Sequence, residues 1–187
     1  MATDNSPGTA LTPLAFFTRE EADTIESAMT RIFPDDDLGP GAKRAGAITY
    51  LDRALAGAEK QHQQAYRTAI KRLDGIAHAK FGAGFGECSN DQQDALIGAL
   101  ADDTLPEFGS APTGAAFFGM LRAHTIEGVF ADPVHGGNRD FAGWRLLGYP
   151  GPKPSYSHEE QQLDAKIVTD RFYSVADYPL ASAGDGK

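Results

Sequence analysis

The sequence predicts a mainly α-helical protein, a single bundle of about five helices followed by a long, loop-rich C-terminal extension. Apolar residues recur at intervals of three and four over several segments, which is the spacing of one helix face. Residue types that cap helix N-termini stand just before these segments. Alternating apolar and polar residues, typical of half-buried strands, are missing over any length. The core is therefore expected to come from helix packing.

The first two helices are marked by their starts and breaks. Thr18 and Glu21 have the spacing of a capping box, in which each side chain bonds to the other residue's backbone N–H. Pro34 lies just beyond this helix, since proline lacks the N–H that a helix interior requires. A second, amphipathic helix is expected to begin after Gly41 and to stop near Gly57.

Three more helices are expected before the extension. One runs from about residue 58 to 79 and is broken by the glycine-rich segment 81–86. Ser89 begins a fourth helix of about three turns, and Thr113 caps a fifth. In the fifth helix, the small residues Gly119 and Gly128 indicate close contact with a neighbouring helix.

The chain beyond residue 130 has little helical signal apart from a possible helix at 159–172. Ordered loops of such length are uncommon in compact domains and are usually functional or bound to a partner. Three regions are therefore expected: a flexible N-terminal segment (1–15), a helical domain (16–152) and a C-terminal extension (153–187) that wraps around a partner.

Composition excludes several classes of function. The 26 acidic and 17 basic residues give a net charge of −9, which argues against nucleic acid or an anionic membrane as the main ligand. The one cysteine, Cys88, excludes an internal disulfide and a metal site built from several cysteines. No apolar run approaches the roughly 18 residues that a direct membrane span requires.

The segment from residue 130 to 152 is the most informative part of the sequence. Two adjacent glycines permit positive φ angles and close backbone approach, and Asp132 and Asn138 can bond to nearby main chain. Trp144 can anchor one end, so the pattern predicts a fixed loop. The candidate interface or loop residues are Phe16, Phe17, Phe130, Asp132, Pro133, His135, Gly136, Gly137, Asn138, Trp144 and Tyr149.

From about Phe16 to Pro152 the sequence resembles subunit 3, the small subunit, of gluconate 2-dehydrogenase and related sugar dehydrogenases. No single motif is specific, because Gly-Gly-Asn and Asp-Pro are common in turns of unrelated proteins. The combination of motifs is specific. The matching elements are Pro34 with the aspartates 35–37 that follow it, Pro40–Ala42, Asp52, 125–130, Asp132–Pro133, His135–Asn138 and Gly143–Trp144.

The resemblance implies a non-catalytic subunit that carries no cofactor or metal. In this family, FAD belongs to a large subunit of the glucose-methanol-choline type, often with a cytochrome c subunit. Many relatives begin with a twin-arginine export signal, whereas residues 1–9 have neither an arginine pair nor an apolar segment. The complex is expected in the periplasm if a signal was trimmed and in the cytoplasm otherwise.

The sequence itself also lacks a dinucleotide site. A Gly-x-Gly-x-x-Gly pattern between a strand and a helix is absent, and the glycines of segment 82–86 follow a helix with the wrong spacing. The redox chemistry is therefore expected in another polypeptide.

Three interpretations of the loop are open. His135 and Asn138 satisfy backbone groups of a turn, or they donate hydrogen bonds across a partner interface. In the third, His135 is a general base oriented by Asp132 or Asp140, and the chain is a small self-sufficient enzyme or a metal-binding helical protein. No serine or cysteine lies in a recognisable nucleophile turn, and the acidic run 35–37 lacks the EF-hand pattern. Phe16 and Phe17 either pack in the core or dock a partner.

Overall fold

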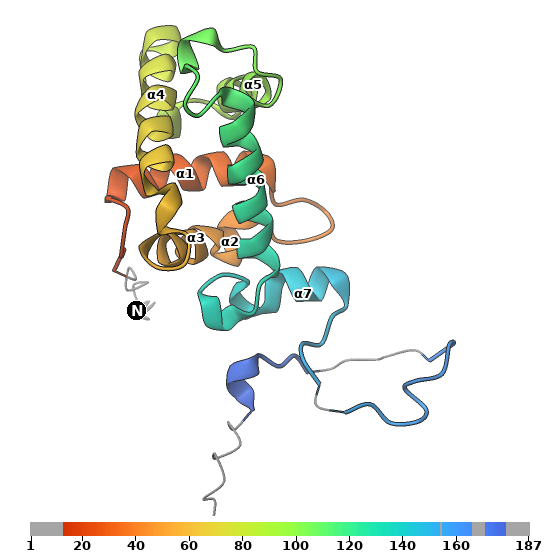
Figure 1. The fold of residues 1–187 in the computed structure, drawn as a ribbon. Helices are drawn as coiled ribbons and strands as arrows, with labels where there is room; N and C mark the ends of the chain where they lie inside the picture. The colour runs from red at the N-terminus through yellow and green to blue at the C-terminus, as the bar shows by residue number, and fades with distance from the viewer. Residues whose placement is uncertain (1–12, 154, 166–170, 179–187) are drawn as a thin grey trace, which may run out of the picture.

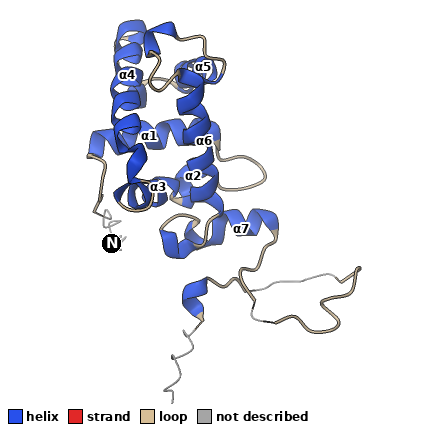
Figure 2. Cartoon of the chain, viewed as in Figure 1, coloured by secondary structure: helices blue, strands red, loops and turns tan. Residues whose placement is uncertain are grey.

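The structure is a computed structural model that describes residues 13–153, 155–165 and 171–178. Within these residues there are seven α-helices, several short 3-10 turns and no strand, so the predicted mainly α-helical class is confirmed (Figures 1 and 2). The helices are α1 (Arg19–Ile32), α2 (Ala42–Ala45), α3 (Ala47–Ala56), α4 (Gln63–Phe81), α5 (Asn90–Ala101), α6 (Gly114–Phe130) and α7 (Ala142–Leu147).

Helix α1 runs across the bundle. It contacts α2, α3, α4, α5 and α6, and it crosses the two long helices α4 and α6 (Figure 1). Helix α3 packs most extensively against α6, and α7 lies beyond the far end of α6. Every helix in the described part of the chain is too short or too polar to span a bilayer.

The predicted helix starts are present. The Thr18 hydroxyl accepts the Glu21 N–H at 3.2 Å, and the Glu21 carboxylate accepts the Thr18 N–H at 2.9 Å. Ser89 forms the same kind of box at α5, and the Thr113 hydroxyl accepts the Ala116 N–H at 3.2 Å at the start of α6. These local rules therefore place three helices correctly.

Three expectations differ from the structure. The second helix is divided at Gly46, whose left-handed conformation (φ 71°) ends α2 and begins α3. The third begins at Gln63, after the 3-10 turn Lys60–His62. No helix forms over the described part of 159–172, where residues 158–164 make turns; 166–170 lie outside the described residues.

The core is apolar and almost closed to solvent. Gly128 lies so close to α3 that a Cβ there would be 2.9 Å from the Ala47 Cα, as expected for a close helix contact. The same expectation was wrong for Gly119, because nothing lies within 4 Å of its Cβ position. The largest fully buried side chains are Tyr66, Phe85, Phe108, Phe117, Ile25, Met29, Leu51, Leu55, Leu73, Leu100, Leu121 and Val129.

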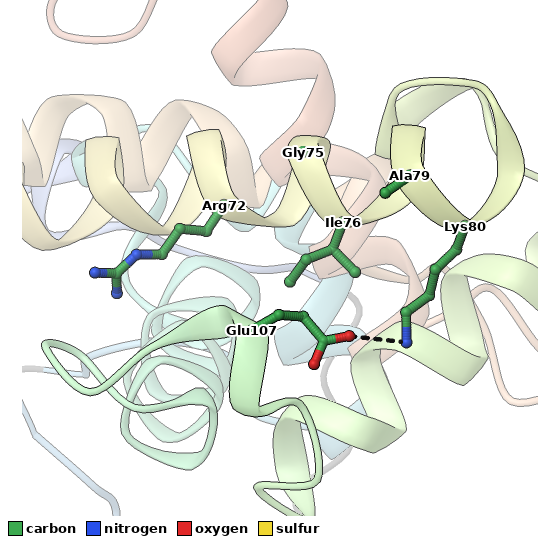
Figure 3. Close-up of a pocket in the computed structure, with 6 residues that line it drawn as sticks. All are labelled: Arg72, Gly75, Ile76, Ala79, Lys80 and Glu107. Carbon is green, nitrogen blue, oxygen red and sulfur yellow. Dashed lines mark ion pairs between the residues drawn. The ribbon is translucent and has the colours of Figure 1, made fainter.

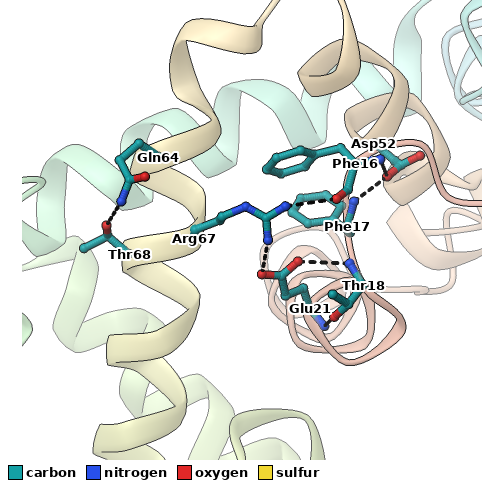
Figure 4. Close-up of polar contacts among 8 residues, drawn as sticks. All are labelled: Phe16, Phe17, Thr18, Glu21, Asp52, Gln64, Arg67 and Thr68. Atoms are coloured by element: carbon teal, nitrogen blue, oxygen red, sulfur yellow. Dashed lines mark hydrogen bonds and ion pairs between the residues drawn. The ribbon is translucent and has the colours of Figure 1, made fainter.

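A buried carboxylate holds the segment before α1 in place (Figure 4). Asp52 of α3 accepts the backbone N–H groups of Ala15, Phe16 and Phe17 at 2.6, 3.0 and 3.0 Å. Phe17 is buried in the core, and Phe16 packs under the Arg67 guanidinium, 4.6 Å from its ring centre. Of the segment expected to be flexible, 1–12 lie outside the described residues, whereas Ala15 is tied to the bundle.

Candidate functional site

The loop that the sequence marked joins α6 to α7 by way of two 3-10 turns, Pro133–His135 and Arg139–Phe141. Asp132 caps the first turn by accepting the Val134 N–H at 3.0 Å, and Gly136 ends it with φ 103°. The backbone then passes through positive φ angles at Asn138, Asp140 and Phe141. The loop is therefore bent sharply back onto the end of α6.

Asn138 is the residue that holds this bend. Its side chain is fully buried; the amide nitrogen donates to the Ala131 carbonyl at 2.9 Å, and the amide oxygen accepts the Gly143 N–H at 2.8 Å. Its backbone N–H donates to the Gly128 carbonyl at 2.8 Å. Asn138 thus joins the last turn of α6 to the first turn of α7 and presents no surface to a partner.

Two glycines allow the backbones to touch. A Cβ on Gly137 would lie 2.1 Å from the Gly128 carbonyl oxygen, and a Cβ on Gly143 would lie 2.2 Å from the Val129 carbonyl oxygen. Any side chain at either position would have to displace main chain. These glycines are therefore explained by close approach rather than by chemistry.

Trp144 anchors α7 within its own chain. It is 4% exposed, and its indole N–H donates to the Phe130 carbonyl at 2.7 Å. Its ring lies edge-on to Tyr149 at 5.0 Å and near Phe141 at 5.6 Å. Tyr149, at 41% exposure, is the member of this aromatic group that reaches the surface.

Asp132 also binds the C-terminal part of the chain. Its carboxylate accepts the Ser174 hydroxyl at 2.5 Å and the Val175 N–H at 2.9 Å, 42 and 43 residues away. Burial by itself would raise the pKa of this carboxyl, but the hydrogen bonds from Ser174, Val134 and Val175 bring the pKa below its usual value. The charged Asp132 carboxylate therefore holds the segment that contains Ser174 and Val175 against the loop.

His135 lies on the rim of a groove of about 600 Å³ between α3 and the loop. The Tyr50 hydroxyl, which also lines the groove, donates to Glu127 at 2.9 Å, and burial together with Glu127 raises the Tyr50 pKa to about 12. Asp140 does not line this groove. The lining residues are Tyr50, Arg53, Ala54, Ala58, Glu59, Ala131, Asp132, Val134 and His135, which include no serine or cysteine.

A smaller hollow of about 310 Å³ lies between α4 and the loop before α6 (Figure 3). The Lys80 ammonium and the Glu107 carboxylate close one side of it at 3.2 Å. The Arg72 guanidinium donates to the Ala111 and Pro112 carbonyls at 3.3 Å each and lies over the Phe108 ring. These polar groups hold the loop against α4.

Sequence reasoning missed a polar cluster around the buried pair Tyr66 and His124, because its histidines are far apart in the chain. The Tyr66 hydroxyl lies 2.8 Å from His124 Nδ1, and both residues are buried. The His62 ring meets the His124 ring edge-on at 5.8 Å, and His62 Nε2 lies 3.4 Å from Glu59. Burial lowers the His124 pKa below its usual 6.5, which favours the neutral ring.

The acidic run 35–37 and the glycine-rich segment 82–86, which the sequence analysis considered as a metal site and a dinucleotide loop, make hydrogen bonds within the fold. Asp35 accepts the Gly41 N–H, and Asp36 accepts the Leu38 N–H at 2.8 Å, so the acidic run forms a turn. Gly82 ends α4, and the next residues lead to buried Phe85, whose N–H donates to Asp74 at 3.0 Å. In the described part of the chain, no group of three or more His, Cys, Asp or Glu side chains suits a metal ion.

The fold is that of a small all-α protein. The side chains of its loop mainly form hydrogen bonds that connect neighbouring segments of backbone. A family model described as gluconate 2-dehydrogenase subunit 3 matches residues 19–151, and the chain belongs to this family. Comparisons with curated proteins and with solved structures gave no match.

Proposed function

We propose that this chain is the non-catalytic small subunit of a dehydrogenase that oxidises a sugar or a sugar acid. The family match over residues 19–151 carries this proposal, because the family is defined as a subunit of gluconate 2-dehydrogenase. The partner is a large subunit of the glucose-methanol-choline type that holds the FAD, in some complexes with a cytochrome c subunit. The small subunit supports folding, FAD retention or export of that partner.

The hydrogen bonds of the loop support a structural rather than a catalytic role. A histidine general base needs a group that orients its ring. Both carboxylate oxygens of Asp132 instead accept hydrogen bonds from Ser174, Val134 and Val175. The competing function, a small enzyme or metal-binding protein using His135 with Asp132 or Asp140, has no comparable observation in its favour.

Co-expression tests the proposal. The chain is produced with a large FAD-dependent subunit of the glucose-methanol-choline type from the same organism, and size-exclusion chromatography records flavin absorbance beside protein. Co-elution with FAD, and loss of soluble flavoprotein when the chain is omitted, are expected. A fully active flavoprotein that elutes separately would refute the accessory role.

A matched variant separates the two functions. His135→Ala removes the candidate base from the groove rim, where the side chain is exposed. Turnover per bound FAD should equal that of the wild-type complex. A loss of turnover in a fully assembled complex would instead favour catalysis by His135.

A further inference from the structure

The groove between α3 and the loop has no part in the proposed accessory role. Its volume of about 600 Å³ lies within the range of small-molecule sites, which is about 300–1,000 Å³. Its walls come from α3, from the turn after α3 and from the loop after α6, all within the segment 19–151 that the family model matches. A small molecule therefore fits here, and the polar groups of the lining indicate its chemistry.

Arg53 brings an unpaired charge to the groove. Within the described part of the chain, its guanidinium makes no hydrogen bond and no ion pair. Gly136 leaves room for this side chain, because a Cβ on Gly136 would lie 2.9 Å from Arg53 Nη1 and 3.1 Å from Arg53 Cζ. The guanidinium thus lies beside the loop backbone, and its N–H donors are available to a ligand.

Two residues offer acceptors to the same groove. Glu59 Oε2 accepts the Gln61 amide at 2.8 Å and lies 3.4 Å from His62 Nε2, which leaves Oε1 to accept from a ligand. The Tyr50 hydroxyl donates to Glu127 at 2.9 Å and can still accept a hydrogen bond. A ligand of this groove therefore needs both acceptors and donors.

Charge argues against a simple ion as the ligand. The carboxylates of Glu59 and Asp132 line the groove, and the carboxylate of Glu127 is bonded to Tyr50. An anion would meet these three carboxylates and a single guanidinium, that of Arg53, so it would be repelled on balance. An ammonium ion has no acceptor for the guanidinium donors. A neutral ligand avoids both problems.

Hydroxyl groups meet these requirements, because each one donates a hydrogen bond and accepts others without carrying a charge. Several of them on one small carbon skeleton make a sugar or a sugar alcohol, whose C–H groups suit the apolar part of the lining. That part consists of Ala54, Ala58, Ala131 and Val134.

We propose that the groove binds a neutral polyhydroxy compound, a sugar or a sugar alcohol. Arg53 donates to one hydroxyl group of the ligand, and Glu59 Oε1 and the Tyr50 hydroxyl accept from others. The site needs no partner subunit, so this inference does not depend on the proposed function.

NMR titration of the full-length chain, labelled with nitrogen-15, tests the site. D-glucose and D-sorbitol should shift the amide signals of Arg53, Glu59 and Val134 in a saturable way, with a Kd of about 1 mM. D-gluconate presents similar hydroxyl groups with a carboxylate and should bind about threefold more weakly, or worse, because of the three carboxylates. If neither D-glucose nor D-sorbitol gives saturable shifts at the groove, the proposal is wrong.

A pair of arginine variants tests the assigned contact. Arg53→Gln should weaken the binding of D-glucose about tenfold, because it removes charged donors from the groove. Arg122→Gln is the matched control, since Arg122 is exposed on α6 and does not line the groove; it should change the Kd by less than about twofold. Equal losses of affinity in the two variants would overturn the assignment.

Filling the groove gives a test that removes no hydrogen-bonding group. Ala58 lines the groove from the exposed turn after α3, so Ala58→Phe should abolish binding while the circular dichroism spectrum and thermal midpoint stay those of the wild type. Wild-type affinity of a folded Ala58→Phe chain would place the ligand elsewhere and refute the site.

The remaining outcomes concern the class of ligand. Tighter binding of D-gluconate, or of glycine as a zwitterion, than of D-glucose would show that the groove selects charged groups, which contradicts the proposal. Failure of these titrations leaves the accessory role intact, because co-elution with the flavoprotein tests that role separately.

Discussion

Asn138 shows why one residue type suits one position of the loop. The position requires a side chain that donates to the Ala131 carbonyl and accepts from the Gly143 N–H at the same time. It also requires a backbone at φ 45°, which asparagine tolerates better than most residues. An amide meets both requirements, whereas a carboxylate has no donor and an aliphatic chain has neither group.

Asn138→Asp should therefore lower the free energy of unfolding by about 2–4 kcal/mol, since a buried carboxylate would face the Ala131 carbonyl. Urea denaturation followed by circular dichroism measures the change. Asn90→Asp is the control, because Asn90 is exposed at the start of α5, where a negative charge is tolerated. Equal stability of Asn138→Asp and wild type would contradict the assigned role.

His124 should make stability depend on pH. Burial, with a smaller contribution from His62, lowers its folded-state pKa, against the opposing effects of Glu127 and Glu59. The unfolded chain, with the usual value of 6.5, then binds more protons than the folded chain as pH falls below 6.5. This contribution to stability is complete above pH 6.5 and is lost as pH falls toward the folded-state pKa.

The His124→Gln variant isolates that contribution, because glutamine can still accept a hydrogen bond from Tyr66. The free energy of unfolding, measured by urea denaturation between pH 8 and pH 5, should fall more steeply with decreasing pH for the wild type. The difference in slope should be at most about 1.4 kcal/mol per pH unit. The comparison at pH 8 shows how much stability the substitution removes by itself. Identical pH slopes for the two proteins would show that His124 does not titrate differently on folding.

Among the elements, those with local signals were predictable and those made by distant contacts were not. Thr18, Ser89 and Thr113 each bond within the next turn, so the sequence shows the cap directly. At Gly46, where the second helix breaks, a Cβ would lie 3.1 Å from the guanidinium of Arg139, a residue of the distant loop. Nothing near Gly46 in the sequence indicates that contact.

The same reasoning applies to the loop and to α7. That Asp132 and Asn138 bond to main chain follows from their residue types, but the contacts of Asp132 with Ser174 and Val175, more than 40 residues away, do not. Helix α7 was missed because it is only six residues long and follows three residues with positive φ angles. The pair Tyr66 and His124 comes together only when α4 packs near α6.

Asp52 offers a test at the scale of one element. Asp52→Asn removes the charge that three backbone N–H groups share and leaves one oxygen to accept them, so a loss of about 1–3 kcal/mol is expected. Amide hydrogen exchange at Ala15–Phe17 should become faster, while exchange in α5 changes little.

Asp37→Asn, an exposed substitution on the turn after α1, is the control and should leave both quantities unchanged. Unchanged exchange at Phe17 in Asp52→Asn would mean that packing of the Phe17 ring, rather than the carboxylate, holds the segment.

At the scale of the whole molecule, one end is the helical bundle, and the other carries α7 and the returning segment 171–178. The bundle of α1 to α6 closes its own core, and the loop fastens α7 to it through Asn138 and Trp144. Asp132 then fastens the returning chain to the loop. The side chains of Asn138, Trp144 and Asp132 thus fasten α7 and the returning segment 171–178 to the end of α6.

Asp132→Ala should therefore release the segment around Ser174 and Val175 without unfolding the bundle. Limited proteolysis should cut within residues 171–178 several times faster, because this segment loses the carboxylate that accepts its Ser174 hydroxyl and Val175 N–H. Turnover per assembled FAD should stay unchanged. Asp140→Asn is the matched control, since Asp140 lies on the same loop at φ 55°, which asparagine also tolerates, and outside the contacts with Ser174 and Val175; it should affect neither measurement. If Asp132→Ala instead assembles fully but loses turnover, Asp132 acts with His135 in catalysis, and the structural account of this loop is wrong.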